Sequence, residues 1–509
     1  MVHSAVFAYI SPSKKKTKAP TNINLREDCL EGNEIAIQNI NNVRATLLSS
    51  GDVWWNLQQG QYFVPNTPPE IEDVSSIFAG AVWIGGFEPV EGGQDILKIA
   101  ATTYRTQGGD FYPGPLNDET GTTEKEVCEQ WDRFFRVTGT EIDQHRVNVI
   151  NYRNQGVEYP KDSMPDNIRY YPGLGNTDFV LKYGFPLPDA GQGLASFYDD
   201  PNSAIDVYDP ENGDYPKIDV RGCEEFVQYP DEMYFWIYND QGGPHLGTQG
   251  QAIQMEVQVQ AFAYESNDEL NDMTFQRYKL INRAQTVIKD CYFAMWVDGD
   301  LGCSEDDYIG CDSARSMAIL YNQDEIDGNP GSDCPGGVAT YGGNVPVLGI
   351  DYFRGPLKPQ IFGDDGELLE LPNPFAEADT FVEIGMSSFV YTNRQGAGEH
   401  PPGTWDPETA EEHYRLLDGQ WRDGLPITFG GSGYNIGSTD TIRYVLPGAP
   451  AQDNDWSMCT AGLGFGDRRT IQASGPFVLK QGAINELIIG VVWVPNQVYP
   501  CPELNNLNK

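Results

Sequence analysis

The sequence lacks long apolar runs and is poor in basic residues. It contains no stretch of about 18 consecutive apolar residues, so a helical membrane span is not predicted. Its 33 Lys and Arg residues stand against 74 Asp and Glu, which gives a formal charge of −41. Phosphates and anionic lipid headgroups would be repelled by this charge. We therefore expect no nucleic-acid partner and no binding to an anionic membrane surface.

The common catalytic motifs are also missing. The chain has no GxSxG around any Ser, no GK[ST] loop, and no HExxH among its five His. Its nine Cys include no CxxC pair, so a zinc site is not predicted. The stretch GGSGYNIG at residues 430–437 does not fit GxGxxG, and we interpret it as a turn. We expect a protein that is not an enzyme, although paired carboxylates leave glycan hydrolysis as an alternative.

The residues that are abundant favour β-structure. The chain has 55 Gly, 35 Pro and 12% aromatic residues, a composition typical of short strands joined by turns. We predict an all-β fold of one or two antiparallel β-sandwiches, jelly-roll-like, with long loops. One short helix is expected near residues 407–417, with Asp406 as N-cap and Pro407 in the first turn. The main predicted strands are at residues 42–48, 77–87, 97–104, 253–264, 273–282, 288–297, 317–321, 381–391 and 486–494.

The strand at 253–264 has the clearest pattern, because apolar residues alternate with Gln and Glu along it. Period two predicts one buried face. With the strands at 273–282 and 288–297 it is predicted to form an antiparallel meander.

Three regions are expected along the chain. Residues 1–24 form either a flexible N-terminal extension or a signal-peptide remnant, since an apolar run at 5–10 is followed by Lys14, Lys15, Lys16 and Lys18. Residues 25–225 form an N-terminal β-rich region. Residues 226–509 form a β-sandwich that carries an acidic loop at 298–312.

That loop, VDGDLGCSEDDYIGCD at residues 297–312, holds six carboxylates and follows an apolar strand. It is not an EF-hand, because Gly302 and Ile309 occupy positions five and twelve. Irregular Ca²⁺ sites need only six to eight oxygen ligands. The loop therefore predicts either a calcium site or a solvated turn; the candidate ligands are Asp298, Asp300, Asp306, Asp307 and Asp312. The stretch NQDEIDGN offers weaker metal candidates, which are Asp324, Asp327 and Asn329.

Two cysteines flank the acidic loop. A disulfide between Cys303 and Cys311 could staple it, and Cys334 is another nearby candidate. Buried free thiols are the alternative for an odd number of cysteines.

Long ordered blocks of the sequence resemble a known group of proteins. They include INNVRATLLSSGDVWWNL, LKIAATTYRTQGGDFYPGPLND, QAFAYESNDELNDMTF, FAMWVDGDLGCSEDDYIGCD and GDRRTIQASGPFVLKQGAINELIIGVVW. From about Asn41 to Trp493 the chain resembles large secreted surface proteins of Bacteroidota that look like type IX secretion substrates. Such proteins usually end in a C-terminal sorting domain, whereas this sequence ends in CPELNNLNK without one.

Together these features predict an extracellular or outer-surface protein. We expect a non-catalytic structural or adhesion role, stabilised by calcium, within a larger surface assembly or filament. Its partners would be other surface proteins or copies of itself. The alternatives are a carbohydrate-binding or glycan-hydrolysing module and an accessory component of the type IX secretion machinery.

Overall fold

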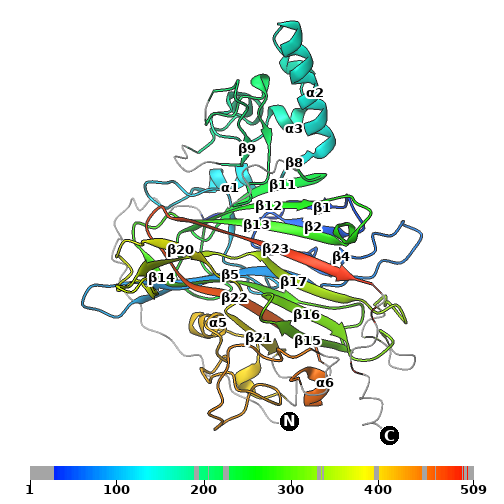
Figure 1. Cartoon of the computed structure of the whole chain (residues 1–509), viewed down its shortest axis with the longest axis vertical. Helices are drawn as coiled ribbons and strands as arrows, with labels where there is room; N and C mark the ends of the chain where they lie inside the picture. The colour runs from blue at the N-terminus through cyan, green and yellow to red at the C-terminus, as the bar shows by residue number, and fades with distance from the viewer. Residues whose placement is uncertain are drawn as a thin grey trace, which may run out of the picture.

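The computed structural model describes residues 28–188, 194–204, 206–221, 229–328, 334, 338–394, 400–449, 455–464, 466–495, 497 and 501. Two large antiparallel sheets dominate it (Figure 1). The predicted extension at residues 1–24 lies outside the described residues.

Sheet 1 has nine strands in the order β1-β2-β3-β5-β14-β22-β21, with β4 paired to β2 and β6 paired to β5. Its strands are β1 Ile35–Gln38, β2 Arg44–Leu48, β3 Asp52–Val53, β4 Tyr62–Phe63, β5 Ala79–Glu88, β6 Ile96–Ala101, β14 Ile288–Asp298, β21 Ser388–Asn393 and β22 Arg468–Leu479.

Sheet 2 also has nine strands, in the order β15-β16-β17-β23-β13-β12-β11-β7, with β8 paired to β11. Its strands are β7 Tyr112–Pro113, β8 Phe135–Thr138, β11 Glu232–Asn239, β12 Met255–Ala263, β13 Met273–Asn282, β15 Asp307–Asp312, β16 Met317–Asn322, β17 Val347–Arg354 and β23 Ile484–Val494.

The main hydrophobic core combines side chains from both sheets. Trp83 and Trp296 of sheet 1 and Trp236 and Tyr278 of sheet 2 all belong to this core and are almost fully buried. Alternate residues of each strand point into it, as the pleat requires. The predicted all-β, sandwich-like fold is confirmed.

A helical insertion covers the outer face of sheet 2 and builds a second core. It contains α1 Lys125–Trp131, α2 Gly139–Gln155, α3 Asp166–Arg169, α4 Thr177–Tyr183 and the two-stranded sheet of β9 Phe197–Tyr198 and β10 Tyr215–Pro216. Trp131 and Phe179 from the insertion pack with Phe235, Phe262 and Phe275 from sheet 2. Strand β12 is consequently buried on both faces, so the prediction of one buried face is wrong.

The longest helix, α2, was not predicted from the sequence. Thr138 and Glu141 form a capping box at its start, and Gly156 ends it with φ 68°. Figure 1 shows α2 rising beyond the end of the sheets. No helix in the described part of the chain is both long and apolar enough to cross a membrane.

The predicted helix near 407–417 exists but begins later. Helix α5 spans Ala410–Leu417 and is capped by Thr409 with Glu412, instead of by Asp406. Asp406 accepts a hydrogen bond from the Thr392 hydroxyl. A further short helix, α6, spans Met458–Ala461.

The predicted meander is confirmed for its first pair, β12 with β13, and wrong for its third strand, β14. Strand β13 pairs with β12 and β23 in sheet 2, whereas β14 pairs with β5 and β22 in sheet 1. The predicted strand at 381–391 is also two strands. These are β20, Thr380–Glu383, and β21; β20 joins β18, Leu357–Phe362, and β19, Leu368–Glu370, in a separate small sheet.

Strands from the two predicted β regions share both sheets, since β5 pairs with β14, and β7 and β8 pair with β11.

Three disulfides lie among the described residues: Cys29–Cys128, Cys303–Cys334 and Cys459–Cys501. The predicted Cys303–Cys311 disulfide is therefore wrong; Cys311 is a buried free thiol on β15, and Cys334 takes its place. These disulfides are typical of an oxidising, extracellular-type environment.

Candidate metal centre

The acidic loop crosses between the two sheets. Strand β14 of sheet 1 ends at Asp298, and strand β15 of sheet 2 begins at Asp307. Asp467 directly precedes β22 in sheet 1, and Asp327 follows β16 in sheet 2. Because β14 is antiparallel to β22 and β15 to β16, all four carboxylates gather at the same end of the sandwich.

The first cluster, here the sheet-1 group, consists of Asp298, Asp300 and Asp467. One carboxylate oxygen from each lies within 4.8 Å of the others. Arg469 runs beside them, with Nε 3.4 Å from Asp298 and Nη2 2.9 Å from Asp467. The Tyr104 hydroxyl donates to Asp298 at 2.5 Å. Two of these three carboxylates therefore already have a cationic partner.

Burial strongly perturbs this group. It raises the pKa of Asp298 to about 7, although Arg469 acts in the opposite direction. Burial and then the charge of Asp298 raise the pKa of Asp300 well above its usual range. No hydrogen bond to the Asp300 carboxylate is found within the described residues. Asp300 is thus the uncompensated member.

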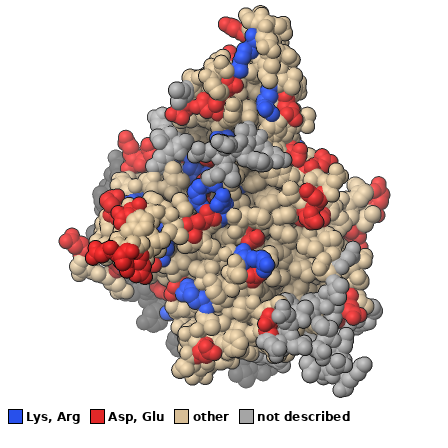
Figure 2. Space-filling view, viewed as in Figure 1, with Lys and Arg blue, Asp and Glu red and all other residues tan. Residues whose placement is uncertain are grey.

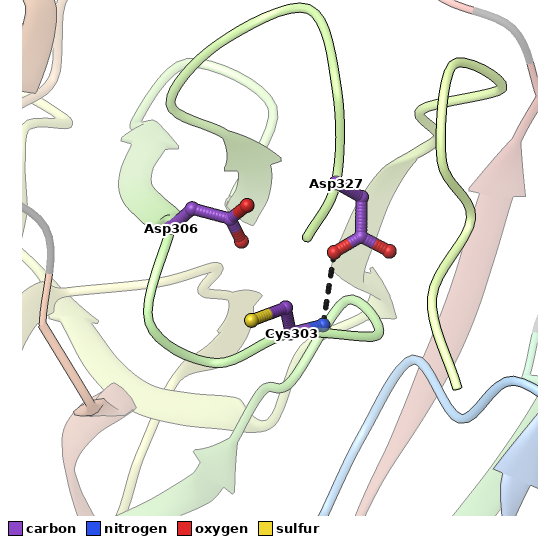
Figure 3. Close-up of side chains that lie close together, drawn as sticks. All are labelled: Cys303, Asp306 and Asp327. Carbon is purple, nitrogen blue, oxygen red and sulfur yellow. Dashed lines mark hydrogen bonds between the residues drawn. The ribbon is translucent and has the colours of Figure 1, made fainter. Parts of the chain in front are cut away.

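The second cluster, here the sheet-2 group, consists of Asp306, Asp307 and Asp327. Figure 3 shows Asp306 pointing toward Asp327 with Cys303 beside them. Asp327 accepts hydrogen bonds from the backbone N–H groups of Cys303, at 2.9 Å, and Tyr341. Sγ of Cys303 also lies within 4.8 Å of the Asp306 and Asp327 carboxylates, but its disulfide to Cys334 removes it as a thiolate ligand.

Three buried oxygen atoms in and beside this group have no hydrogen-bond donor in the described structure: Asp306 Oδ1, Asp307 Oδ1 and Asn322 Oδ1. Asp307 is only 4% exposed, and its other oxygen accepts from the Leu301 N–H at 2.9 Å. Asn322 is directly opposite Asp307 in the β15–β16 ladder and is fully buried. Buried oxygens without donors call for water or a cation.

No Lys or Arg forms an ion pair with the sheet-2 group, as far as the chain is described. Burial raises the pKa of Asp306 to about 7 and that of Asp327 to about 6. The pKa of Asp307 is raised well above its usual range by burial and then by the negative charge of Asp300. This effect of Asp300 links the two clusters electrostatically.

The structure thus brings together Asp298 and Asp300 in one cluster and Asp306 and Asp307 in the other. It separates Asp312, which accepts from the Ala314 and Arg315 N–H groups at 3.0 Å and pairs with the Arg315 side chain. Partial burial opposes the change, but the hydrogen bonds from Arg315 lower the pKa of Asp312. Its charge is already satisfied locally.

Among the weaker candidates, Asp327 belongs to the sheet-2 group. The Asp324 carboxylate accepts from the Ile326 N–H at 2.9 Å. Asn329 lies outside the described residues. Sequence reasoning missed Asp467, which is far from the loop in sequence; its only signal is its place before a strand that begins with Arg468 and Arg469.

The donor chemistry of this end fits a hard cation. Its ligand atoms are carboxylate and amide oxygens, and the nearest cysteine is oxidised. Ca²⁺ prefers such oxygens, six to eight in number, whereas Zn²⁺ sites use thiolate and imidazole.

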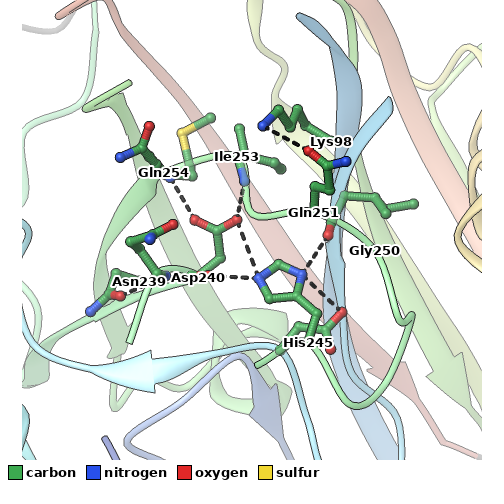
Figure 4. A network of polar contacts seen from close by, with 12 residues as sticks. Lys98, Asn239, Asp240, His245, Gly250, Gln251, Ile253 and Gln254 are labelled. Carbon is green, nitrogen blue, oxygen red and sulfur yellow. Dashed lines mark hydrogen bonds and ion pairs between the residues drawn. The ribbon is translucent and has the colours of Figure 1, made fainter. Parts of the chain in front are cut away.

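A second buried polar network has a different character. Nδ1 of His245 lies 2.7 Å from the Ile99 carbonyl oxygen, and Nε2 lies 2.6 Å from the Asp240 carbonyl oxygen. Asp240 accepts from the N–H groups of Ile253 and Met255, as Figure 4 shows for Ile253. Every polar atom here has a protein partner, so the network fastens a loop to β12 and leaves no position for a ligand.

Comparison of the sequence with protein-family models gives no match, and comparison with curated proteins gives none either.

Proposed function

We propose that the protein is a non-catalytic structural or adhesion protein of the cell surface, and that calcium bound at its acidic end ties the two sheets together. One observation carries the proposal: residues 299–306 cross between the sheets with unneutralised, buried carboxylates at the far side. A cation there would join strand ends of both sheets. The disulfides and the resemblance to secreted surface proteins of Bacteroidota support the location.

The ion belongs on the sheet-2 side of this end. Arg469 already neutralises much of the sheet-1 group, and a second cation beside it would be repelled. The sheet-2 group has no such partner and contributes Asp306, Asp307 and Asp327, with Asn322 next to them. Asp300 adds negative charge from the sheet-1 side. These oxygens would hold the ion and supply the attraction between the sheets.

Glycan binding receives less support. A sugar-stacking platform needs exposed aromatic rings, yet nine of the ten tryptophans are buried and Trp405 is partly buried. Their place in the core favours the structural role over the carbohydrate-binding alternative.

The test compares Asp307→Asn with Asp312→Asn in the full chain, since both remove one charge from the same loop. After chelation with EGTA, Ca²⁺ is titrated calorimetrically. We expect Asp307→Asn to weaken binding at least ~10-fold, because it removes a buried ligand, and Asp312→Asn to bind like the wild type. Calcium at 100 times its Kd should raise the free energy of unfolding by about 2.7 kcal/mol. Absence of binding heat, with a melting temperature indifferent to chelation, would refute the calcium tie.

A further inference from the structure

A small lobe, residues 357–383, exposes aromatic side chains away from both cores. It contains β18, β19 and β20, with β18 in the centre. Phe362, Phe375 and Phe381 are 53%, 66% and 60% exposed. None of the three belongs to a core cluster of the described chain. Three exposed phenylalanines in one lobe indicate a surface that contacts another polypeptide segment.

The strand register places apolar side chains on both faces of this lobe. Phe362 is opposite Leu368 on one face, whereas Ile361 is opposite Leu369 and Pro359 is opposite Phe381 on the other. Leu368 and Leu369 are also more than a third exposed. A sheet normally buries one face against another layer. Here Phe362 on one face and Phe381 on the other remain exposed, so both faces offer apolar surface to a further segment.

The charge of the lobe restricts what that segment can be. Residues 357–383 contain seven acidic residues and a single lysine, Lys358. Lys358 pairs with Glu370, and Lys480 from outside the lobe pairs with Glu377. In Figure 2 acidic side chains gather at the left edge of the molecule, on the side where Figure 1 labels β20. Two lobes from two copies would repel each other, so the occupant must be basic as well as apolar.

One segment of this chain has that chemistry. Residues 5–18, AVFAYISPSKKKTK, join an apolar run to Lys14, Lys15, Lys16 and Lys18. They lie outside the described residues, which begin at Asp28. Fully extended, the chain from Asp28 reaches on the order of 35 Å to Lys18 and on the order of 80 Å to Ala5. Tethering also gives the segment a high effective concentration at its own lobe.

We propose that residues 5–18 bind the 357–383 lobe of the same molecule. Their apolar side chains cover Phe381 and the face that it shares with Ile361 and Leu369, and their lysines lie against the acidic rim. The contact is independent of the proposed calcium site at the end of the sandwich that carries Asp298 and Asp307.

Hydrogen exchange on the full chain tests this contact. The charge reversal K14E/K15E/K16E/K18E is compared with K14R/K15R/K16R/K18R, which keeps the charge. We expect the Glu variant to exchange at least ~10-fold faster than the wild type in the peptides that cover residues 357–383, and the Arg variant to match the wild type. Phe381→Ser should in turn speed exchange in residues 5–18, whereas Phe362→Ser, on the opposite face, should not.

Equal exchange in the wild type and the Glu variant would overturn the proposal. Protection that rises with protein concentration would also overturn it, because the segment would then come from a second copy. Protection of residues 357–383 that persists in the Glu variant but is lost in Phe381→Ser would show an apolar occupant other than the lysine segment, and would count against the proposal equally.

Discussion

The two carboxylate clusters at the end of the sandwich lie side by side but handle their charge differently. In the sheet-1 group, Arg469 pairs with Asp298 and Asp467, and Tyr104 adds a hydrogen bond. In the sheet-2 group, backbone N–H groups donate to one oxygen each of Asp306 and Asp307. No Lys or Arg of the described structure forms an ion pair with this group. Acidic residues that are adjacent in sequence can therefore separate into two clusters, one neutralised by an arginine and one without a cationic side-chain partner.

The largest loss of stability should come from removing the arginine of the sheet-1 group. In Arg469→Met, Asp298 and Asp467 lose their partner while Asp298 stays buried. Removing one member of a buried pair costs about 3 to 5 kcal/mol, so we expect a loss of that size in urea unfolding at pH 7.5. The loss should shrink at pH 5, because Asp298, whose pKa is about 7, then binds a proton. Arg469→Lys, which keeps the charge, should lose less.

A loss below about 1 kcal/mol in Arg469→Met would show that the sheet-1 group does not depend on its arginine. The two clusters would then be alike, and the cation would have no reason to prefer sheet 2.

A smaller effect should come from opening the loop beside the sheet-2 group. The Cys303–Cys334 disulfide closes a segment with a sequence separation of 31, so the double change Cys303→Ser and Cys334→Ser should cost about 3 kcal/mol in chemical unfolding. Calcium affinity, measured by calorimetry, should fall with it, because the Cys303 N–H holds Asp327.

The matched control is Cys29→Ser with Cys128→Ser, which removes a disulfide far from the loop in sequence. It should reduce stability without changing calcium affinity. If both pairs leave the affinity unchanged, the loop does not need its disulfide to form the site.

The smallest effect concerns pH in the metal-free protein. Burial raises the pKa of Asp306 to about 7 and of Asp327 to about 6, above the value of about 4 for unfolded Asp. The folded state therefore binds more protons between pH 4 and 7, and its stability rises as pH falls through that window. We expect a gain on the order of 1 kcal/mol from pH 7.5 to 5 in EGTA, after allowance for solvent access.

Saturating calcium should abolish or reverse this gain, since the bound ion holds the carboxylates ionised. Urea titrations at the two pH values, with and without calcium, measure both slopes. Identical slopes in EGTA and in calcium would place the ion away from Asp306 and Asp327.

Local patterns were enough to find most of the strands. Alternation predicted residues 253–264, and the structure has β12 at Met255–Ala263. The acidic loop was found because its carboxylates are adjacent in sequence. Helix α5 was placed near its true position, but its start was wrong because Thr409 with Glu412 forms a better cap than Asp406.

Long-range pairing could not be predicted from such patterns. Strand β14 follows β13 after a short turn, yet it crosses to sheet 1 and pairs there with β5 and β22. Because both partners are distant in sequence, local patterns do not reveal this crossing. Asp467 could not be assigned to the sheet-1 group for the same reason, because it is far from the acidic loop in sequence. The choice of Cys334 over Cys311 depends on the β15–β16 ladder, which holds Cys311 within a strand opposite Ala318.

The positions of β22 and β23 have a consequence for biosynthesis. Strand β22 lies between β14 and β21 in sheet 1, and β23 lies between β17 and β13 in sheet 2, so the last two strands are interior in both sheets. Neither sheet has all its interior strands until the chain has been synthesised through Leu479 for sheet 1 and Val494 for sheet 2. Domains usually fold as units during synthesis, but this sandwich can complete its sheets only after β22 and β23 have emerged.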